Sequence, residues 1–446
     1  MTHPTSTPRS GPVVGVVLAA LATGALGALG LLLLAFPGAR EHTTTGVALL
    51  AFAAGWAVLH QLSTRFTAQP QRWAAVPAVA MAGAGLTVLV SAPGTQALTK
   101  TGWVWPPLLL ALAVWSAVQL RRAMTSRARW LLQPVLALMA LAAVGGAVET
   151  VALAHDEGAL AMPGRRYDVG DHSLHLSCTG AGSPTVVLLN GTGEVSASWA
   201  RVVPQVAATT RVCAYDRAGQ GWSDDASLAQ DGLGIVRDLR ALLQAAGEQS
   251  PYLLVGHSAG GVYGMTYAAH HPGEVAGLVL LDASSPRQFT VLPDFEGEYA
   301  MMRRAFGVLP SVARLGLGRL VSSDMFSTLP QPAAGQVRAF GTSSRGLASM
   351  RDESSRYRDS FRQAQALRTL GAKPLAVVTA TGSLTGTPGW AAAQAELVAL
   401  STDALHVVAD TSHEGLLVDA SGAARSADAV VRAVRAVRTG DPVGPA

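Results

Sequence analysis

The hydrophobic pattern of the chain changes near residue 156 and divides the sequence into two parts. A helix needs about 20 mostly apolar residues to cross the hydrocarbon core of a bilayer. In the first part, apolar residues form long runs of about that length, at about 12–36, 46–63, 73–92, 104–121 and 130–154. We therefore predict a transmembrane domain of about five helices over 1–155, followed by a linker over 156–164. The first run is uncharged and too long for the core of a signal peptide, so we expect it to be retained as a span.

Aromatic and basic residues support these spans and predict their orientation. Tryptophans stand near the predicted span ends, as in the aromatic belts of membrane proteins, at Trp73, Trp103, Trp105 and Trp130. Basic residues gather in the N-terminal tail and in the second and fourth loops, at Arg9, Arg65, Arg72, Arg121, Arg122, Arg127 and Arg129. The opposite loops hold only Arg40 and Lys100. Because cytoplasmic loops are enriched in Lys and Arg, this predicts a cytoplasmic N-terminus and places everything after the spans outside the cell membrane. If one of the five predicted spans does not cross the membrane, the part of the chain after the spans would lie on the cytoplasmic side instead.

Charge is scarce and unevenly distributed. Charged residues make up 14% of the chain, against roughly 25% in a typical soluble domain. Residues 1–155 hold 9 of the 33 Lys and Arg and 2 of the 29 Asp and Glu, a net charge of +7, against −3 in the remainder. No long basic run occurs, which excludes a nucleic-acid-binding arm. Glu149 lies within the last apolar run, and because His155 and Asp156 follow it, we expect it near the membrane interface. A functional carboxylate inside the membrane is the alternative.

In the second part, short apolar runs alternate with helical stretches. Residues 165–169 and 172–178 predict a β-hairpin around Gly170-Asp171. Further strands are predicted at 184–190, 211–215, 252–256, 277–282, 374–380 and 406–410, and helices at 198–208, 225–246, 259–271, 388–400 and 422–438. This alternation predicts a doubly wound, mostly parallel sheet. A long insertion, 283–373, separates two of the strands.

The segment Gly256-His257-Ser258-Ala259-Gly260 lies between a predicted buried strand and a predicted helix. This is the context of a nucleophile elbow, in which two glycines allow a sharp turn that exposes the serine hydroxyl above the sheet. The pattern therefore predicts a nucleophilic serine at this position.

From about 165 to 440 the chain resembles the α/β-hydrolase family. The resemblance rests on motifs in that family's order, namely PTVVLLNGTG, RVCAYDRAGQGWSD, LLVGHSAGG, GLVLLDAS and a late His413. The chain is most similar to the membrane-anchored bacterial branch with a CTG-x-GSPTVVL opening. The resemblance implies an α/β-hydrolase domain over 165–446 with a helical cap at 283–373.

The resemblance also implies roles for individual residues. Ser258 would be the nucleophile and His413 its general base. The backbone N–H groups of Ala259 and Thr192 would form the oxyanion hole. The family usually has His-Gly where this chain has Asn190-Gly191. Since the donor to the oxyanion is a backbone N–H, replacing His by Asn190 would not remove the oxyanion hole. It would affect how the loop is held.

The acid of the predicted triad has several candidates. The loop after the seventh strand, 379–386, is the common family position, and it contains no Asp or Glu. Asp282, at the end of the sixth strand, keeps the order Ser, Asp, His and lies at the carboxyl edge of the sheet, so it is our first choice. Asp410 is the second choice, and a Ser–His dyad with water is the third.

Other positions are interpreted from the same resemblance. Asp216-Arg217 would shape the loop near the pocket, and Trp199 and Trp222 would wall the site. Cys178 and Cys213 fall on neighbouring strands of this fold, which implies a disulfide in an extracellular domain, with two buried thiols as the alternative.

The insertion carries apolar residues at helical spacing over 298–326, interleaved with Arg303, Arg304, Arg314 and Arg319. Ordinary cap helices that pack on the core are the favoured interpretation. Covering an apolar acyl pocket is the role that the family implies, and contact with anionic lipid is a third reading.

Together these features predict a membrane-anchored serine hydrolase that cleaves a carboxylic ester, lipid-like esters included, through an acyl-enzyme. Its expected partners are a small-molecule or lipid ester and, through the N-terminal helices, membrane lipids, with no nucleic acid. We expect no cofactor and no metal, since no H-E-x-x-H motif occurs. Two alternatives remain: an acyltransferase on the same triad, and a non-catalytic, membrane-anchored binding scaffold.

Overall fold

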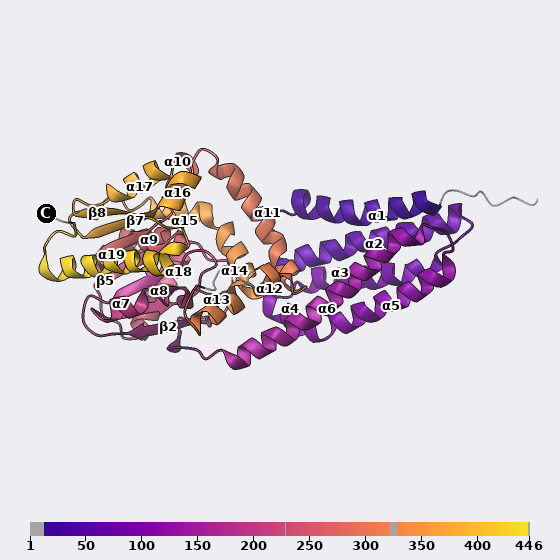
Figure 1. Cartoon of the computed structure of the whole chain (residues 1–446), viewed down its shortest axis with the longest axis horizontal. Helices are drawn as coiled ribbons and strands as arrows, with labels where there is room; N and C mark the ends of the chain where they lie inside the picture. Colours follow the sequence, from indigo (N-terminus) through magenta and orange to yellow (C-terminus); the bar gives the residue numbers. More distant parts are fainter. Residues whose placement is uncertain (1–12, 228, 322–327, 445–446) are drawn as a thin grey trace, which may run out of the picture. The chain divides into compact units, whose positions relative to one another are not determined.

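The computed structural model describes residues 13–227, 229–321 and 328–444, whose contacts divide them into two units (Figure 1). The first unit contains the described residues up to Glu157 together with Arg304–Leu320. The second contains Gly158–Arg303 and the described residues from Val321 onward. Three parts of the sequence predictions lie outside the described residues: Arg9, residue 12 of the predicted run 12–36, and residues 322–326 of the insertion.

The first unit is built from long apolar helices. Their bounds are α1 Val13–Gly30, continued by a π-helical turn Leu31–Ala35, then α2 Glu41–Phe66, α3 Ala75–Ser91, α4 Thr95–Lys100, α5 Trp105–Ala123 and α6 Arg129–Ala159. By length and composition, four of these helices could cross a membrane. The number rises to five if α4 with its 3₁₀ extension and α5, which meet at a bend of 54°, count as one span. Each of the five predicted apolar runs thus falls on a long helix.

Glycines let α1, α2 and α3 approach closely. A Cβ atom at Gly55 of α2 would lie 2.8 Å from the carbonyl oxygen of Ala20 in α1. A Cβ at Gly85 of α3 would lie 2.9 Å from the carbonyl oxygen of Gly46 in α2. Both positions therefore need glycine, as is common where apolar helices pack backbone to backbone.

Part of the insertion belongs to the first unit. Arg314 makes a bidentate ion pair with Glu41, with 3.0 Å between one pair of atoms, and also donates to Thr95 O at 2.9 Å. Arg319 donates to Glu149 at 2.7 Å and to Asp156 at 2.8 Å. The sequence placed all of 283–373 in one cap, whereas Arg304–Leu320 packs with the apolar helices.

The second unit contains an eight-stranded mixed sheet in the order β1-β2-β4-β3-β5-β6-β7-β8. Its strands are β1 Arg165–Asp168, β2 Ser173–Thr179, β3 Val186–Leu189, β4 Val212–Tyr215, β5 Tyr252–His257, β6 Val275–Leu281, β7 Leu375–Ala380 and β8 Ala404–Ala409. β1 and β2 are antiparallel, and β3 to β8 are parallel. The predicted hairpin and the mostly parallel sheet are therefore confirmed.

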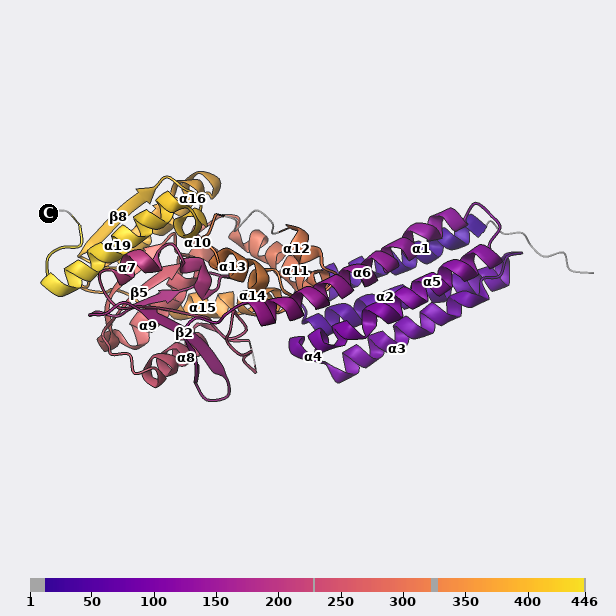
Figure 2. The ribbon, with the colours of Figure 1, turned by 60° about the horizontal axis from the view of Figure 1, so that its bottom comes forward.

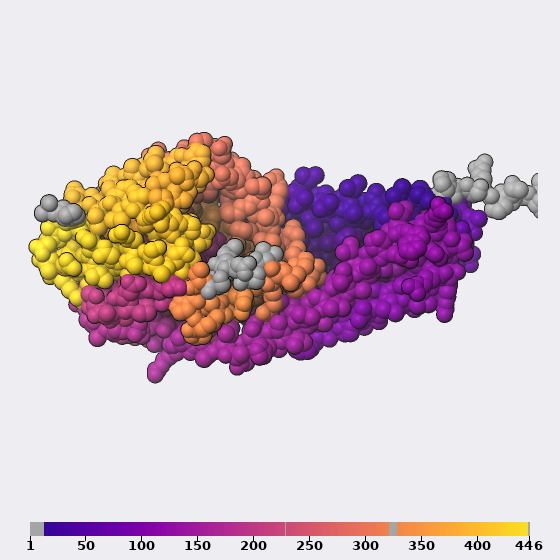
Figure 3. Space-filling model, in the orientation of Figure 1, coloured from indigo at the N-terminus to yellow at the C-terminus, as the bar shows by residue number. Residues whose placement is uncertain are grey.

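Two layers of helices cover the sheet (Figure 2). One face packs against α8 Gly232–Ala245, α9 Ala259–His270 and α15 Tyr357–Ala364. The other face packs against α7 Val203–Ala207, α18 Gly415–Val418 and α19 Ala420–Thr439, and α19 lies on the outside of this unit (Figure 3). Along β6, Leu278 and Leu280 face the first layer, while Val279 and Leu281 face the second. Both faces are thus apolar, as in a parallel sheet buried on both sides.

Two helices begin later than their hydrophobic patterns suggested. The helix predicted from residue 225 starts at Gly232, because the Asp231 side chain accepts from Gly234 N at 2.9 Å and caps the end there. The helix predicted at 198–208 is a 3₁₀ turn Ser196–Trp199 followed by α7, which carries Pro204 in its first turn. Proline has no N–H to donate, and in the first turn of a helix that N–H would have no partner within the helix, so Pro204 fits this start.

Cys178 and Cys213 stand opposite each other in the register of β2 and β4 and are joined by a disulfide. The bond closes a loop of 35 residues and ties the antiparallel edge to the parallel strands.

The insertion forms helices α10 Gln288–Val291, α11 Phe295–Ala313, α12 Leu317–Val321, α13 Ala333–Gly341, α14 Ser344–Ser355 and α15. Aromatic side chains of its second-unit part form one cluster, which contains Phe289, Phe295, Tyr299, Tyr357 and Phe361.

We predict that Arg314→Ala destabilises the first unit by about 3 kcal/mol, because it leaves Glu41, which is 2% exposed, buried without its counter-charge. Thermal unfolding of the full chain in detergent measures this loss. The double variant Glu41→Gln/Arg314→Met should recover much of it. Arg432→Ala, which breaks an exposed pair with Asp428 on α19, is the matched control and should change little. An Arg314→Ala protein that melts like the wild type would contradict the prediction.

Candidate active site

The turn between β5 and α9 holds Ser258 in a backbone conformation that residues other than glycine rarely adopt. Its φ is 54°, and such strain is typical of a nucleophile elbow. A Cβ at Gly256 would lie 2.5 Å from Gly261 N, and a Cβ at Gly260 would lie 2.1 Å from Leu189 O. The two flanking glycines are therefore required by the close approach of neighbouring backbone.

Asp282 and His413 meet at the carboxyl edge of the sheet. Asp282 directly follows β6, and His413 lies in the loop after β8. His413 Nδ1 and Asp282 Oδ2 are 2.7 Å apart, across 131 positions of sequence. The elbow lies at the same edge, since Ser258 N donates to Leu281 O at 3.1 Å.

The Asp282 carboxylate is fully buried and surrounded by donors. Trp390 Nε1 donates to Oδ1 at 2.8 Å, Ala380 N donates to Oδ1 at 3.2 Å, and Ser383 Oγ donates to Oδ2. Burial alone would raise the pKa of Asp282, but the His413 hydrogen bond and charge, with Ser383 and Trp390, lower it below its ordinary value. Asp282 is therefore held as a carboxylate that can accept from His413 Nδ1–H.

The segment after β7, which the sequence left as a loop without an acid, is helix α16 Thr381–Gly386. Instead of a carboxylate it supplies Ser383, and α17 Trp390–Val398 supplies Trp390, both as donors to Asp282. Asp410, the second candidate acid, accepts from Thr381 Oγ1 at 3.2 Å and stands outside this arrangement.

The predicted oxyanion loop lies against Ser258. A Cβ at Gly191 would be 3.0 Å from the Ser258 Cβ. Among the residues that the structure describes, no group accepts a hydrogen bond from the backbone N–H of Thr192 or of Ala259. In this part of the chain, neither of the two predicted oxyanion donors is therefore used by a backbone acceptor.

Asn190, which stands where the family usually has histidine, has a structural role in this chain. It is fully buried at the end of β3, where its Oδ1 accepts from Trp199 Nε1 at 2.8 Å. Its Nδ2 donates to Tyr215 O at 2.9 Å. The amide therefore satisfies a donor and an acceptor at once, and Trp199 supports the loop from behind.

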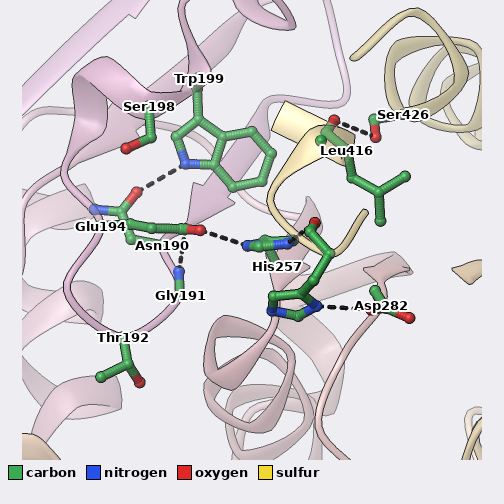
Figure 4. A network of polar contacts seen from close by, with 12 residues as sticks. Asn190, Gly191, Thr192, Glu194, Ser198, Trp199, His257, Asp282, Leu416 and Ser426 are labelled. Carbon is green, nitrogen blue, oxygen red and sulfur yellow. Dashed lines mark hydrogen bonds and ion pairs between the residues drawn. The ribbon is translucent and has the colours of Figure 1, made fainter. Parts of the chain in front are cut away.

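His257, the residue before Ser258, joins the two sides of the site (Figure 4). Its Nδ1 lies 2.5 Å from Glu194 Oε1, and its Nε2 lies 3.0 Å from the His413 carbonyl oxygen. The other oxygen of Glu194 accepts from Gly191 N. One ion pair thus connects the oxyanion loop to the loop that carries His413.

The charges of this pair reinforce each other. Burial alone would lower the pKa of His257, but the Glu194 carboxylate raises it above 6.5. Burial alone would raise the pKa of Glu194, but the charge and hydrogen bond of His257, with Gly191 N, lower it below 4.5.

A third buried pair lies behind the oxyanion loop. Arg217, in the segment that the sequence expected to shape this loop, pairs with Glu353 of α14 at 2.9 Å. The sequence offered no signal for Glu353, because its partners lie 90 or more positions away.

In the described part of the chain, one group of potential metal ligands gathers closely: Cys178, Cys213 and Glu248. The two sulfurs are bonded to each other, and Glu248 pairs with Arg211 at 2.7 Å. Disulfide sulfurs are not thiolate ligands, so this group does not fit a metal.

Comparison with known proteins supports this architecture. Residues 184–310 match the family described as alpha/beta hydrolase fold. An uncharacterized protein of Schizosaccharomyces pombe is 31% identical over 310 residues, which cover 60% of this chain and 55% of that protein. A 2-hydroxy-6-oxononadienedioate/2-hydroxy-6-oxononatrienedioate hydrolase of Paraburkholderia xenovorans is 34% identical over 133 residues, 28% of this chain and 45% of that protein.

Among solved structures, the enol-lactonase from Burkholderia xenovorans LB400 matches with a TM-score of 0.44 and 23% identity, over 62% of this chain and all of that one. The chain spans about half the length of the curated relatives named here. The family match and the sheet show that the C-terminal part of the chain contains an alpha/beta hydrolase domain.

The His257–Glu194 pair predicts a pH-dependent stability. Stabilisation through the raised pKa of His257 is complete below pH 6.5 and is lost as the pH rises through the folded value. Stabilisation through the lowered pKa of Glu194 is present above pH 4.5 and is lost as the pH falls through its folded value. Glu194→Gln should therefore lower the melting temperature most between pH 4.5 and 6.5, and less at higher pH.

Thermal unfolding of both proteins across pH 5 to 9 measures this difference. Glu396→Gln, which breaks an exposed pair with Arg287, is the control and should show little effect at any pH. A Glu194→Gln effect that is independent of pH would contradict the prediction.

Proposed function

We propose that this chain is a membrane-anchored serine hydrolase that cleaves a carboxylic ester through an acyl-enzyme. The observation that carries the proposal is the 2.7 Å contact between His413 Nδ1 and the buried Asp282 carboxylate, at the sheet edge where the strained elbow presents Ser258. A buried carboxylate, an imidazole that it orients and a nearby activated hydroxyl are the parts of a catalytic triad.

In the first half-reaction, Ser258 Oγ attacks the ester carbonyl carbon while His413 Nε2 accepts the hydroxyl proton. Negative charge moves to the carbonyl oxygen, where the backbone N–H groups of Thr192 and Ala259 stabilise it. As the tetrahedral intermediate collapses, the C–O bond to the leaving alcohol breaks and His413 returns the proton to that alcohol. The product is an acyl ester of Ser258.

In the second half-reaction, water attacks the acyl carbon and His413 accepts its proton. Collapse of the second intermediate breaks the bond to Ser258 Oγ, which regains a proton from His413, and the carboxylic acid leaves. Asp282 remains ionised throughout, because its lowered pKa keeps it a carboxylate. It holds His413 with Nε2 toward Ser258 and stabilises the imidazolium that forms twice per turnover.

The apolar helices of the first unit serve as the anchor in this proposal. Two features support a hydrolase domain outside the cell membrane: the excess of Lys and Arg in the loops on one side, and the disulfide, which persists in oxidising compartments. Ester substrates that partition into the membrane would then be near the domain.

We expect a fluorophosphonate probe to label the wild-type chain and to leave Ser258→Ala unlabelled, because the probe reacts with an activated serine and does not require the natural substrate. Gel fluorescence of the purified full chain measures the labelling, and a melting curve verifies that the variant is folded. A folded wild type that does not react would contradict the proposal and favour a binding scaffold.

The assignment of Asp282 is tested by Asp282→Asn. We expect turnover of p-nitrophenyl butyrate to fall about 10³- to 10⁴-fold, since an amide does not hold the reactive tautomer of His413. Asp410→Asn is the matched control, because Asp410 contacts Thr381 rather than His413, and it should retain wild-type turnover. Equal rates for Asp282→Asn and the wild type would exclude Asp282 as the triad acid.

A further inference from the structure

The back of the oxyanion loop is held by a charged side chain that the triad does not use. Arg217 NH1 donates to Asn190 O at 2.5 Å, and Arg217 NH2 donates to Gly191 O at 2.8 Å. Arg217 is 3% exposed, so it reaches this loop from inside the protein. Two successive carbonyl groups of the loop are therefore fixed by one guanidinium.

Holding these carbonyls orients the N–H groups of the same peptides. In a trans peptide the C=O and N–H point in opposite directions. The Asn190–Gly191 peptide is held at both ends, by Arg217 at its oxygen and by Glu194 at its nitrogen. The next peptide is held at Gly191 O, so the Thr192 N–H points away from Arg217. Gly191 lies beside the Ser258 side chain, which is where an oxyanion would form.

Arg217 is in turn held by a residue of the cap. Both oxygens of Glu353 accept from Arg217 NH2, at 3.0 and 2.9 Å. Glu353 is 7% exposed and also accepts from Tyr263 OH at 2.8 Å and from Gln220 Nε2 at 3.3 Å. Burial alone would lower the pKa of Arg217, but the charge of Glu353 raises it above its ordinary value, so the guanidinium stays charged.

Glu353 also contacts the oxyanion residue directly. Thr192 Oγ1 donates to Glu353 Oε1 at 3.2 Å and bonds Tyr357 OH. One turn earlier on α14, Met350 lies against the loop, since a Cβ at Gly193 would be 2.5 Å from its Cε. The same helix therefore covers the loop, anchors the Thr192 side chain and neutralises the guanidinium that fixes the Gly191 carbonyl.

We propose that Arg217 and Glu353 are the positioning residues of the oxyanion hole, so that docking of cap helix α14 aligns the Thr192 N–H with the reacting carbonyl. This proposal rests on the proposed hydrolase function and extends it to the cap. Neither residue touches the substrate. They act by fixing one peptide, and they make the catalytic competence of the elbow depend on a segment about a hundred residues away.

The test measures kcat and KM for p-nitrophenyl butyrate, the rate of fluorophosphonate labelling and the melting temperature, all on the full chain in detergent. Glu353→Gln keeps the shape of the side chain and removes its charge. Arg217→Lys keeps the charge but removes the planar guanidinium that donates to both carbonyl oxygens. We expect kcat to fall about 100-fold in both, the cost of a misplaced oxyanion donor, with KM changed less than threefold. Thr192→Val, which removes only the side-chain anchor, should lower kcat about tenfold.

Two further variants separate positioning from stability. Arg345→Lys is the matched control. Arg345 belongs to the same helix, but it donates to Asp225 at 2.8 Å and to Gly221 O at 3.0 Å, away from the oxyanion loop. It should retain kcat within threefold of the wild type. The double variant Arg217→Met/Glu353→Met removes both buried charges, so it should melt at a higher temperature than either single variant while its kcat remains low.

The outcomes distinguish this inference from the proposed function. A wild type that neither labels nor turns over would remove the proposed function and this inference with it. A reactive wild type with Glu353→Gln and Thr192→Val within threefold of it would overturn the inference alone, as would an equal loss in Arg345→Lys. A double variant whose kcat recovers together with its melting temperature would assign the pair a purely structural role. If a single variant fails to fold, Thr192→Val and the double variant decide the question.

Discussion

Burial of the Asp282 carboxylate is the constraint around which the site is organised. A buried anion is stable only when donors surround it, and here the donors come from the end of β7, from the helices that follow β7 and from the loop that follows β8. Trp390 and Ser383 follow β7, Ala380 N ends β7, and His413 follows β8. Satisfying one carboxylate therefore brings the histidine loop to the sheet edge that carries Ser258. The geometry of the predicted triad and the stability of this edge have the same origin.

Buried charged groups also hold the oxyanion loop. Glu194 connects Gly191 to His257, and Arg217 connects the loop to Glu353 in the cap. Buried ion pairs of this kind add little net stability, but losing one partner is costly. They consequently specify a single arrangement of the loop. The neutral Asn190 amide, held by Trp199, occupies the position that family members usually fill with histidine, and the charged contacts lie on either side of it.

The first unit follows the rule for buried charge in an apolar setting. Residues 1–155 contain only two acidic residues, Glu41 and Glu149. Both are buried, and both pair with arginines of the Arg304–Leu320 segment, Arg314 and Arg319. These carboxylates therefore have a structural use, because they bind arginines that lie 273 and 170 positions further along the chain. The arginines interleaved in that segment, which suggested cap packing or lipid contact, include the partners of these carboxylates.

Local patterns determined much of this protein. Long apolar runs, and short apolar runs that alternate with helical stretches, depend on neighbouring residues alone, so the helices, the sheet and the strand-to-helix turn at Ser258 were predictable. The position of Asp282 at the sheet edge was also predictable, because it follows a predicted strand, while its role as the acid belongs to the proposed function. Helix starts at Gly232 and Val203 were not, since a capping Asp231 and Pro204 outweighed the hydrophobic pattern. Only the tertiary structure could decide the partners of Glu194, Arg217, Glu353 and Arg314, because an ion pair between distant positions leaves no periodicity in the sequence and depends on where the chain returns in space.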